Sequence, residues 1–265
     1  MAEKKEHKIV SASTGAQMTK EEAAAANQAA KKAAAPVGSA TPYRIGAIVL
    51  WLLAIGCEVL AVLVTFGKID LKFMPSLWQM IAFLVLDLIF LVIGSQLWKK
   101  ANHINPASKK NPTKFWLWNN MGLIVAILCF VPLIFLLLTN KDLDKKTKTI
   151  AAVAAAVALL IGGAASIDYN PISAEEKEAA VAALEGTAVY WTPYGKVYHT
   201  HVLDEVMNHT TEDGKDCPYL NRSDSLTRGT VAEAIAAGKS KLCSYCQRHD
   251  GIQGEGLLTD GAEEP

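Results

Sequence analysis

The chain has 265 residues and a net charge of +0, because 26 Lys and Arg balance 26 Asp and Glu, and its mean hydropathy is +0.20. These averages describe a mildly apolar soluble protein, but they combine an apolar middle with polar ends. The sequence has no glycine-rich phosphate loop and no credible Ser/His/Asp set, which excludes the enzyme classes that those motifs define. Its character changes at about residue 167, and the two parts are therefore interpreted separately.

Residues 1–44 are polar and lack the apolar core of a signal peptide. An alanine-rich stretch runs from Glu21 to Ala35, after a capping pattern at Thr19–Glu22 and before Pro36. We expect a polar, disordered tail with a transient helix. The first apolar segment then acts as an uncleaved insertion signal.

Four apolar segments follow this tail. A helix needs about 20 mostly apolar residues to cross roughly 30 Å of hydrocarbon, and the segments 45–66, 77–97 and 117–138 meet that requirement. The fourth, 150–167, is short and rich in alanine, so it must pack against its neighbours through small residues. The sequence therefore predicts an all-α membrane bundle of four helices.

Two acidic residues interrupt the apolar segments, Glu58 in the first and Asp87 in the second. In an antiparallel hairpin they lie at similar depth, and we expect both to face the bundle interior because a carboxylate is costly in lipid. One interpretation is the proton or cation site of a carrier. The other is a pair of protonated acids with hydrogen bonds inside the bundle, which we favour because no internal repeat or further charges mark a pathway.

Lysine and arginine flank the predicted spans unequally. With the N-terminus inside, nine of these residues lie on the inner flanks and six on the outer flanks, which favours a cytoplasmic N-terminus. Four crossings return the C-terminal part to the cytoplasm, whereas it lies outside if the alanine-rich segment does not cross. We expect an integral, multi-pass plasma-membrane protein with both termini in the cytoplasm.

After the spans, the sequence predicts a linker helix over 168–187, a metal-binding module over 188–248 and an acidic, disordered tail over 249–265. Strand-forming residues flank the turn at Pro193–Gly195, which indicates a β-hairpin. Thr230–Glu233 has the pattern of a capping box that begins a short helix. Together these elements predict a small α+β domain.

Three cysteines give this domain its chemistry. Cys217, Cys243 and Cys246 cannot all pair as disulfides, but a C-x-x-C knuckle with one distant cysteine and one histidine is typical of a Cys3His zinc site. A redox C-x-x-C would need a thioredoxin-like βαβ context, which is missing. Since so small a domain has little core, the ion would supply much of its folding free energy.

The order of four motifs carries a resemblance. The motifs are YWTPYGKVYH at Tyr190–His199, CPYL at Cys217–Leu220, GTVAEAIAAG at Gly229–Gly238 and CSYC at Cys243–Cys246. Residues 188–247 resemble a small bacterial metal-binding module that is attached to diverse membrane and secreted proteins. Their layout is similar to the zinc domain of the Ada DNA-repair methyltransferases, which implies a zinc-binding domain.

The resemblance is partial. The Ada domain uses four cysteines, one of them a methyl acceptor, with its first two closely spaced, and here Asp213 stands four residues before Cys217. Methyl transfer is therefore not expected. The resemblance implies His199, in the Tyr-His motif, as the fourth ligand, with His201 and His209 as alternatives.

The function expected from these features is binding rather than catalysis. A membrane-tethered module with a structural zinc ion would recognise a protein or nucleic-acid partner, and no catalytic residue is assigned. One alternative is a zinc hydrolase, which requires an open coordination position and a general base such as Glu205 or Asp204. Another is a proton-linked carrier that uses Glu58 and Asp87. A coordination sphere filled by protein ligands would favour binding.

Overall fold

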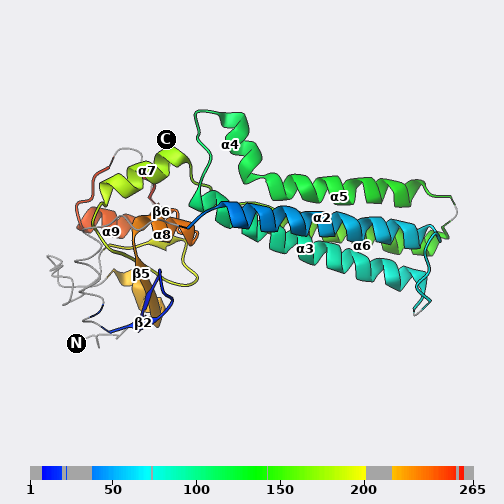
Figure 1. The fold of residues 1–265 in the computed structure, drawn as a ribbon, viewed down its shortest axis with the longest axis horizontal. Helices are drawn as coiled ribbons and strands as arrows, with labels where there is room; N and C mark the ends of the chain where they lie inside the picture. The colour runs from blue at the N-terminus through cyan, green and yellow to red at the C-terminus, as the bar shows by residue number, and fades with distance from the viewer. Residues whose placement is uncertain are drawn as a thin grey trace. The chain divides into compact units, whose positions relative to one another are not determined.

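The computed structural model describes residues 8–19, 22, 38–72, 74–141, 143–200, 217–254 and 257–259. The chain divides into two compact units (Figure 1). The helical unit consists of Ala40–Asn102 and Pro112–Tyr169. The sheet unit consists of the described residues within Met1–Ser39, His103–Asn111 and Asn170–Pro265.

The helical unit is built on four long apolar helices, which confirms the four apolar segments identified in the sequence (Figure 1). They are α2 (Thr41–Thr65), α3 (Ser76–Ile104), α5 (Met121–Thr139) and α6 (Lys145–Ser166). Each is long and apolar enough to cross a membrane. The third begins later than expected, because the chain turns at Asn120 and the residues before it form the short helix α4 (Pro112–Asn119).

The alanine-rich helix α6 packs through its small residues, as its composition indicates. Its buried face consists of Ala151, Ala152, Ala155, Ala158, Gly162, Gly163 and Ser166. A Cβ atom added at Gly162 would lie 2.8 Å from a methyl group of Leu91 on α3, so a larger residue would force the helices apart. Close packing of this kind holds a weakly hydrophobic helix in a bundle.

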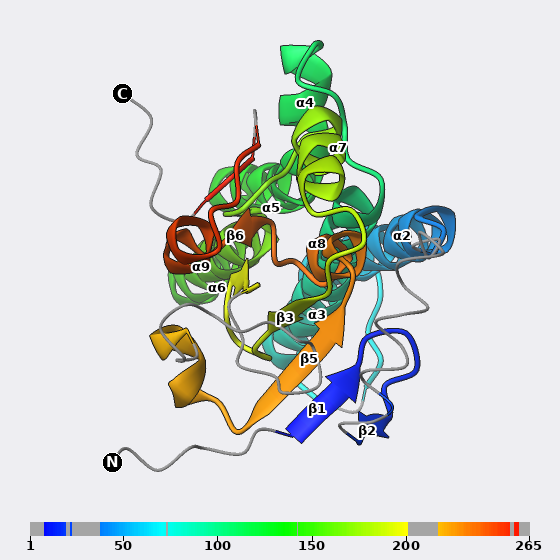
Figure 2. The same cartoon turned by 90° about the vertical axis from the view of Figure 1, so that its left-hand side faces the viewer.

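The sheet unit contains a four-stranded sheet in the order β2-β1-β5-β3. Its strands are β1 (Lys8–Ser11), β2 (Gln17–Met18), β3 (Val189–Trp191) and β5 (Ser225–Gly229). β1 is antiparallel to β2 and parallel to β5, and β3 is antiparallel to β5. Figure 2 shows β1 and β5 side by side, although they come from opposite ends of the chain.

A second, two-stranded parallel sheet and three helices complete this unit. The strands are β4 (Val197–Tyr198) and β6 (Lys241–Leu242), and the helices are α7 (Ala174–Ala183), α8 (Val231–Ala236) and α9 (Ser244–His249). Tyr190 and His199 exchange backbone hydrogen bonds of 2.8 and 2.7 Å, which closes the expected hairpin. The expected capping box at Thr230 and Glu233 begins α8. The local signals in the sequence therefore correspond to the elements that form.

The two ends of the chain differ from the expectation of disordered tails. Residues 8–18 form the β1–β2 hairpin, and Ile9 packs against the core of the sheet unit. Near the C-terminus, Leu257 and Leu258 also pack against that core, and Thr259 forms a β-bridge with Leu242. Strands this short depend on a sheet edge for stability, and that edge lies far away in the sequence. The alanine-rich helix expected after Thr19 lies largely outside the described residues.

The loop between α3 and α4 belongs to the sheet unit and is bound to α7. The N–H of Ala174 donates to the carbonyl of Ala107 at 3.1 Å, and the Ser108 hydroxyl donates to the Glu175 carboxylate. The Lys177 ammonium donates to the last two carbonyls of α3. These contacts connect the loop after the second apolar helix to the domain after the fourth.

Candidate metal centre

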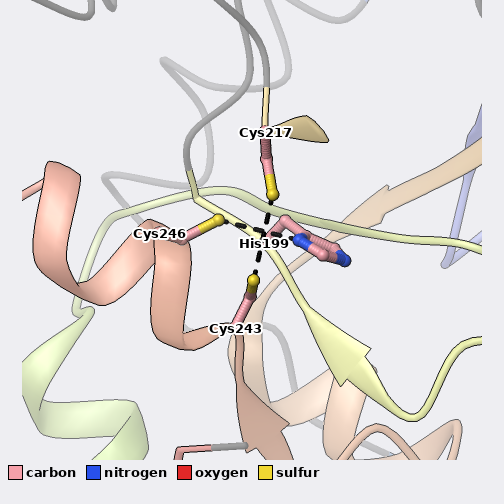
Figure 3. A group of neighbouring side chains, drawn as sticks. All are labelled: His199, Cys217, Cys243 and Cys246. Carbon is pink, nitrogen blue, oxygen red and sulfur yellow. Dashed lines mark hydrogen bonds between the residues drawn. The ribbon is translucent and has the colours of Figure 1, made fainter. Parts of the chain in front are cut away.

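Four side chains of the sheet unit converge on one point. They are His199, Cys217, Cys243 and Cys246, and their ligand atoms all lie within 4.8 Å of one another. The three sulfur atoms and a ring nitrogen of His199 point toward a common centre (Figure 3). In the described part of the chain, this is the group of histidine, cysteine and acidic side chains that could hold a metal ion.

Strand pairing explains how the first two ligands meet. β4 and β6 are parallel with Tyr198 opposite Leu242, so the next residues, His199 and Cys243, leave the sheet side by side. The N–H of Cys243 donates to the carbonyl of Tyr198 at 2.9 Å and holds this arrangement. His199 and Cys243, which are far apart in the sequence, are thus placed beside each other where a metal ion could bind.

The other two ligands come from short helices. Cys217 immediately precedes the 3-10 helix η1 (Pro218–Arg222), whose first turn is closed by the N–H of Leu220 donating to the carbonyl of Cys217. Cys243 occupies the N-cap of α9, and Cys246 lies in the first turn of that helix. The turn brings the Cys246 sulfur back toward Cys243, which is the geometry that a C-x-x-C knuckle provides.

Two interatomic distances fit tetrahedral coordination. The Sγ atoms of Cys217 and Cys243 are 3.8 Å apart, and Sγ of Cys246 lies 3.6 Å from Nδ1 of His199. With Zn–S bonds of about 2.3 Å and Zn–N bonds of about 2.0–2.1 Å, the edges of a tetrahedron are about 3.8 Å between sulfurs and about 3.5–3.6 Å between sulfur and nitrogen. The donor set therefore has the size and the atom types of a Cys3His metal site.

The three thiols are buried and close together, so each one affects the pKa of the others. A hydrogen bond with Cys217 lowers the pKa of Cys243, whereas the same contact raises the pKa of Cys217 to about 12. The contact with Cys217 also raises the pKa of Cys246. A metal ion that used all three sulfurs as thiolates would displace the protons that they carry.

Among the described histidines, only His199 belongs to this group. His201 and His209, and the candidate bases Asp204 and Glu205, lie outside the described residues. His249 stacks its ring on Tyr245, with ring centroids 4.1 Å apart. Of the four ligands expected from the sequence, all four are brought together.

The two intramembrane acids lie in a different place and form no metal group. Asp87 is fully buried, and it interacts electrostatically with Glu58, as expected for acids at similar depth. Glu58 is in hydrogen-bonding contact with Cys129. Neither carboxylate oxygen of Asp87 has a hydrogen-bond partner among the described residues, so the hydrogen bonds expected for this acid are not observed.

A further polar residue does not stand out in the sequence. Arg228 on β5 is buried, with an exposed fraction of 6 %. An isolated arginine in a polar segment resembles an ordinary surface residue, and only the alternation of β5 and its two neighbouring strands place it in the core. No family model, curated protein or solved structure matches this chain.

Proposed function

We propose that this protein is a membrane-anchored module that binds one zinc ion through His199, Cys217, Cys243 and Cys246. The observation that carries the proposal is that four buried donors of the correct types lie within 4.8 Å of one another. Three soft thiolates with one imidazole suit zinc, and the ion would stabilise a small domain by tying three separate parts of it together.

We infer that the metal is structural. A catalytic zinc site keeps one position for water or substrate, whereas four protein donors fill a tetrahedral site. The resemblance to Ada-like zinc domains agrees with this role and, since the metal group has three cysteines rather than four, gives no support to methyl transfer.

X-ray absorption at the zinc edge of the purified full-length protein tests this proposal. We expect one zinc per chain with three sulfur and one nitrogen neighbours. Two sulfur neighbours with two lighter atoms, one of them exchangeable with solvent, would instead support the hydrolase alternative. Absence of a bound metal after purification without chelators would contradict both.

Charge favours a protein partner for this module. The sheet unit, residues 1–39, 103–111 and 170–265, carries 16 Lys and Arg against 20 Asp and Glu, a net charge of −4. Nucleic-acid binding depends on an excess of Lys and Arg that neutralise phosphates, so an acidic domain is poorly suited to it. We therefore propose a scaffolding role toward a basic segment of another protein. Binding of the full-length protein to double-stranded DNA or single-stranded RNA at low salt would contradict this choice.

We further propose that both termini lie on the same side of the membrane. β1 precedes the first apolar helix and pairs in register with β5, which follows the fourth. Two paired strands must share one aqueous compartment, so the helices between them must cross an even number of times. The loop between α3 and α4 binds α7 and fits the same arrangement. The lysine asymmetry then favours the cytoplasm.

Cysteine labelling tests this arrangement in intact cells. Tyr194 is 98 % exposed on the β3–β4 turn, and Lys68 is exposed in the turn after α2. With an impermeant thiol reagent, we expect Lys68→Cys to be labelled and Tyr194→Cys to be protected until the cells are opened. Labelling of Tyr194→Cys alone would reverse the orientation, and labelling of both would contradict an even number of crossings.

A further inference from the structure

Arg228 is a buried arginine on β5. Leu226 and Arg228 alternate with half-buried residues along this strand, so both side chains lie on the face that packs on the core. Arg228 is directly opposite Ser11 of β1 and Tyr190 of β3. A cationic side chain in the centre of the sheet is unusual, because burying an unpaired charge is costly.

One edge of the guanidinium is buried and unsatisfied by the residues that the structure describes. Its Nε and Nη2 atoms are both buried and have no hydrogen-bond partner among the described residues. These two N–H groups point in parallel from one edge of the planar group, and this edge binds a carboxylate or phosphate through two hydrogen bonds. The unsatisfied donors are therefore the pair that one oxyanion would satisfy.

The neighbouring residues do not neutralise this charge. The cross-strand neighbours Ser11 and Tyr190 are uncharged. Glu233 lies near the following residue, Gly229, but its carboxylate accepts hydrogen bonds from the N–H and hydroxyl of Thr230 at the start of α8. The Glu233 carboxylate is therefore committed to capping a helix.

We propose that Arg228 binds a single oxyanion, a phosphate or carboxylate group, through Nε and Nη2. The site is separate from the metal centre, and the proposal does not depend on zinc. An anion bound to Arg228 would offset the cost of burying its charge. It would thereby stabilise β5, the strand that pairs with both β1 and β3. Since the sheet unit as a whole carries a net charge of −4, the attraction must come from directed hydrogen bonds rather than from a general positive field. Chloride, which cannot accept the two bonds in parallel, is not expected to replace the oxyanion.

Hydrogen exchange of the full-length protein in detergent tests this site, read by mass spectrometry at the peptides that contain β1 and β5. Inorganic phosphate, acetate and chloride are compared at equal ionic strength and pH. A ligand that binds only the folded sheet slows exchange through unfolding of that sheet. We expect saturating phosphate or acetate to slow exchange several-fold, and chloride to have no effect. A response to phosphate alone identifies a phosphoryl group, and a response to acetate alone identifies a carboxylate.

Three variants make the test specific. Arg228→Met removes the charge and keeps an unbranched side chain, so in chloride its sheet should be at least as protected as that of the wild type, and it should not respond to the oxyanions. Arg228→Lys keeps the charge without the paired donors and should lose most of the response even if the Met variant folds poorly. Lys8→Gln changes the net charge equally at an exposed position of β1 and should respond as the wild type does.

Two results would overturn the proposal. One is a wild-type protein whose sheet exchanges equally fast in phosphate, acetate and chloride. The other is an oxyanion effect that is unchanged in Arg228→Met and Arg228→Lys, which would place the binding elsewhere.

Discussion

Replacing Cys243 with serine should release the metal and unfold much of the sheet unit. Apparent binding free energies of structural zinc are about 10–16 kcal/mol, so one of four ligands accounts for roughly 3 kcal/mol or more. Domains of ordinary size are stable by only about 5–15 kcal/mol. Loss of this ligand therefore removes a large part of the stability of a unit that joins segments distant in the sequence.

The position of Cys243 makes the interpretation specific. It occupies the N-cap of α9, where its side chain makes no capping hydrogen bond. Serine is a favourable N-cap and could stabilise α9 by up to about 1 kcal/mol. A destabilised Cys243→Ser variant is therefore not explained by damage to the helix. Because Cys243 is also buried in the core, the metal content distinguishes loss of the thiolate from loss of packing.

The assay combines metal content with hydrogen exchange of the full-length protein. Wild type should contain one zinc per chain, and Cys243→Ser should contain much less, with faster exchange in β4, β6 and α9. Cys57→Ser is the matched control, because Cys57 lies in α2 and is not part of the metal group. A Cys243→Ser protein that retains one zinc and wild-type protection would refute the proposed metal site.

Three further predictions follow from other parts of the structure. Ile9→Asp should remove β1 from the sheet, because Ile9 packs against the core, at a cost of about 1 kcal/mol or more that faster exchange in β5 would reveal. Replacing Glu58 with Gln and Asp87 with Asn should leave assembly nearly unchanged, and a proton or cation flux in liposomes that these variants abolish would instead support a carrier. The hydrogen bond from Ser108 lowers the pKa of Glu175 to about 2, so the stability from this contact is present above about pH 4.5 and is lost as the pH falls toward 2. Ser108→Ala should raise that pKa in a carboxyl NMR titration, and an unchanged value would contradict the contact.

The helical unit was largely predictable because its signals are local. A run of apolar residues long enough for a membrane is visible in any one segment, and the four apolar helices are found where the sequence indicates. The exception is the start of the third, where the turn at Asn120 separates α4 from α5. The side-chain amides of Asn119 and Asn120 donate to the carbonyls of Phe115 and Trp116, four residues earlier. The sequence signal for ending a helix here is too weak to predict the break.

The residues of the candidate metal centre could be predicted for a chemical reason. Thiols and an imidazole at knuckle spacing have few alternative roles, so Cys217, Cys243 and Cys246 were identified without knowledge of the fold. The choice of His199 over His201 and His209 rested on the resemblance to a known module. The parallel register of Tyr198 with Leu242 supplies the physical basis, since it places His199 beside Cys243.

The sequence by itself determined the elements whose cause is local: apolar helices, capped helices, the hairpin and the types of ligand atom. Only the tertiary structure decided which distant segments share a sheet. β1 has four residues and no strong strand signal of its own, and it is ordered because the edge of β5 offers hydrogen bonds and a place for Ile9. The same pairing encloses Arg228, which as sequence is an ordinary charged residue and in the fold is a buried cation with two donors that no described residue satisfies. Long-range pairing energies depend on both partners at once, and no single stretch of sequence contains them.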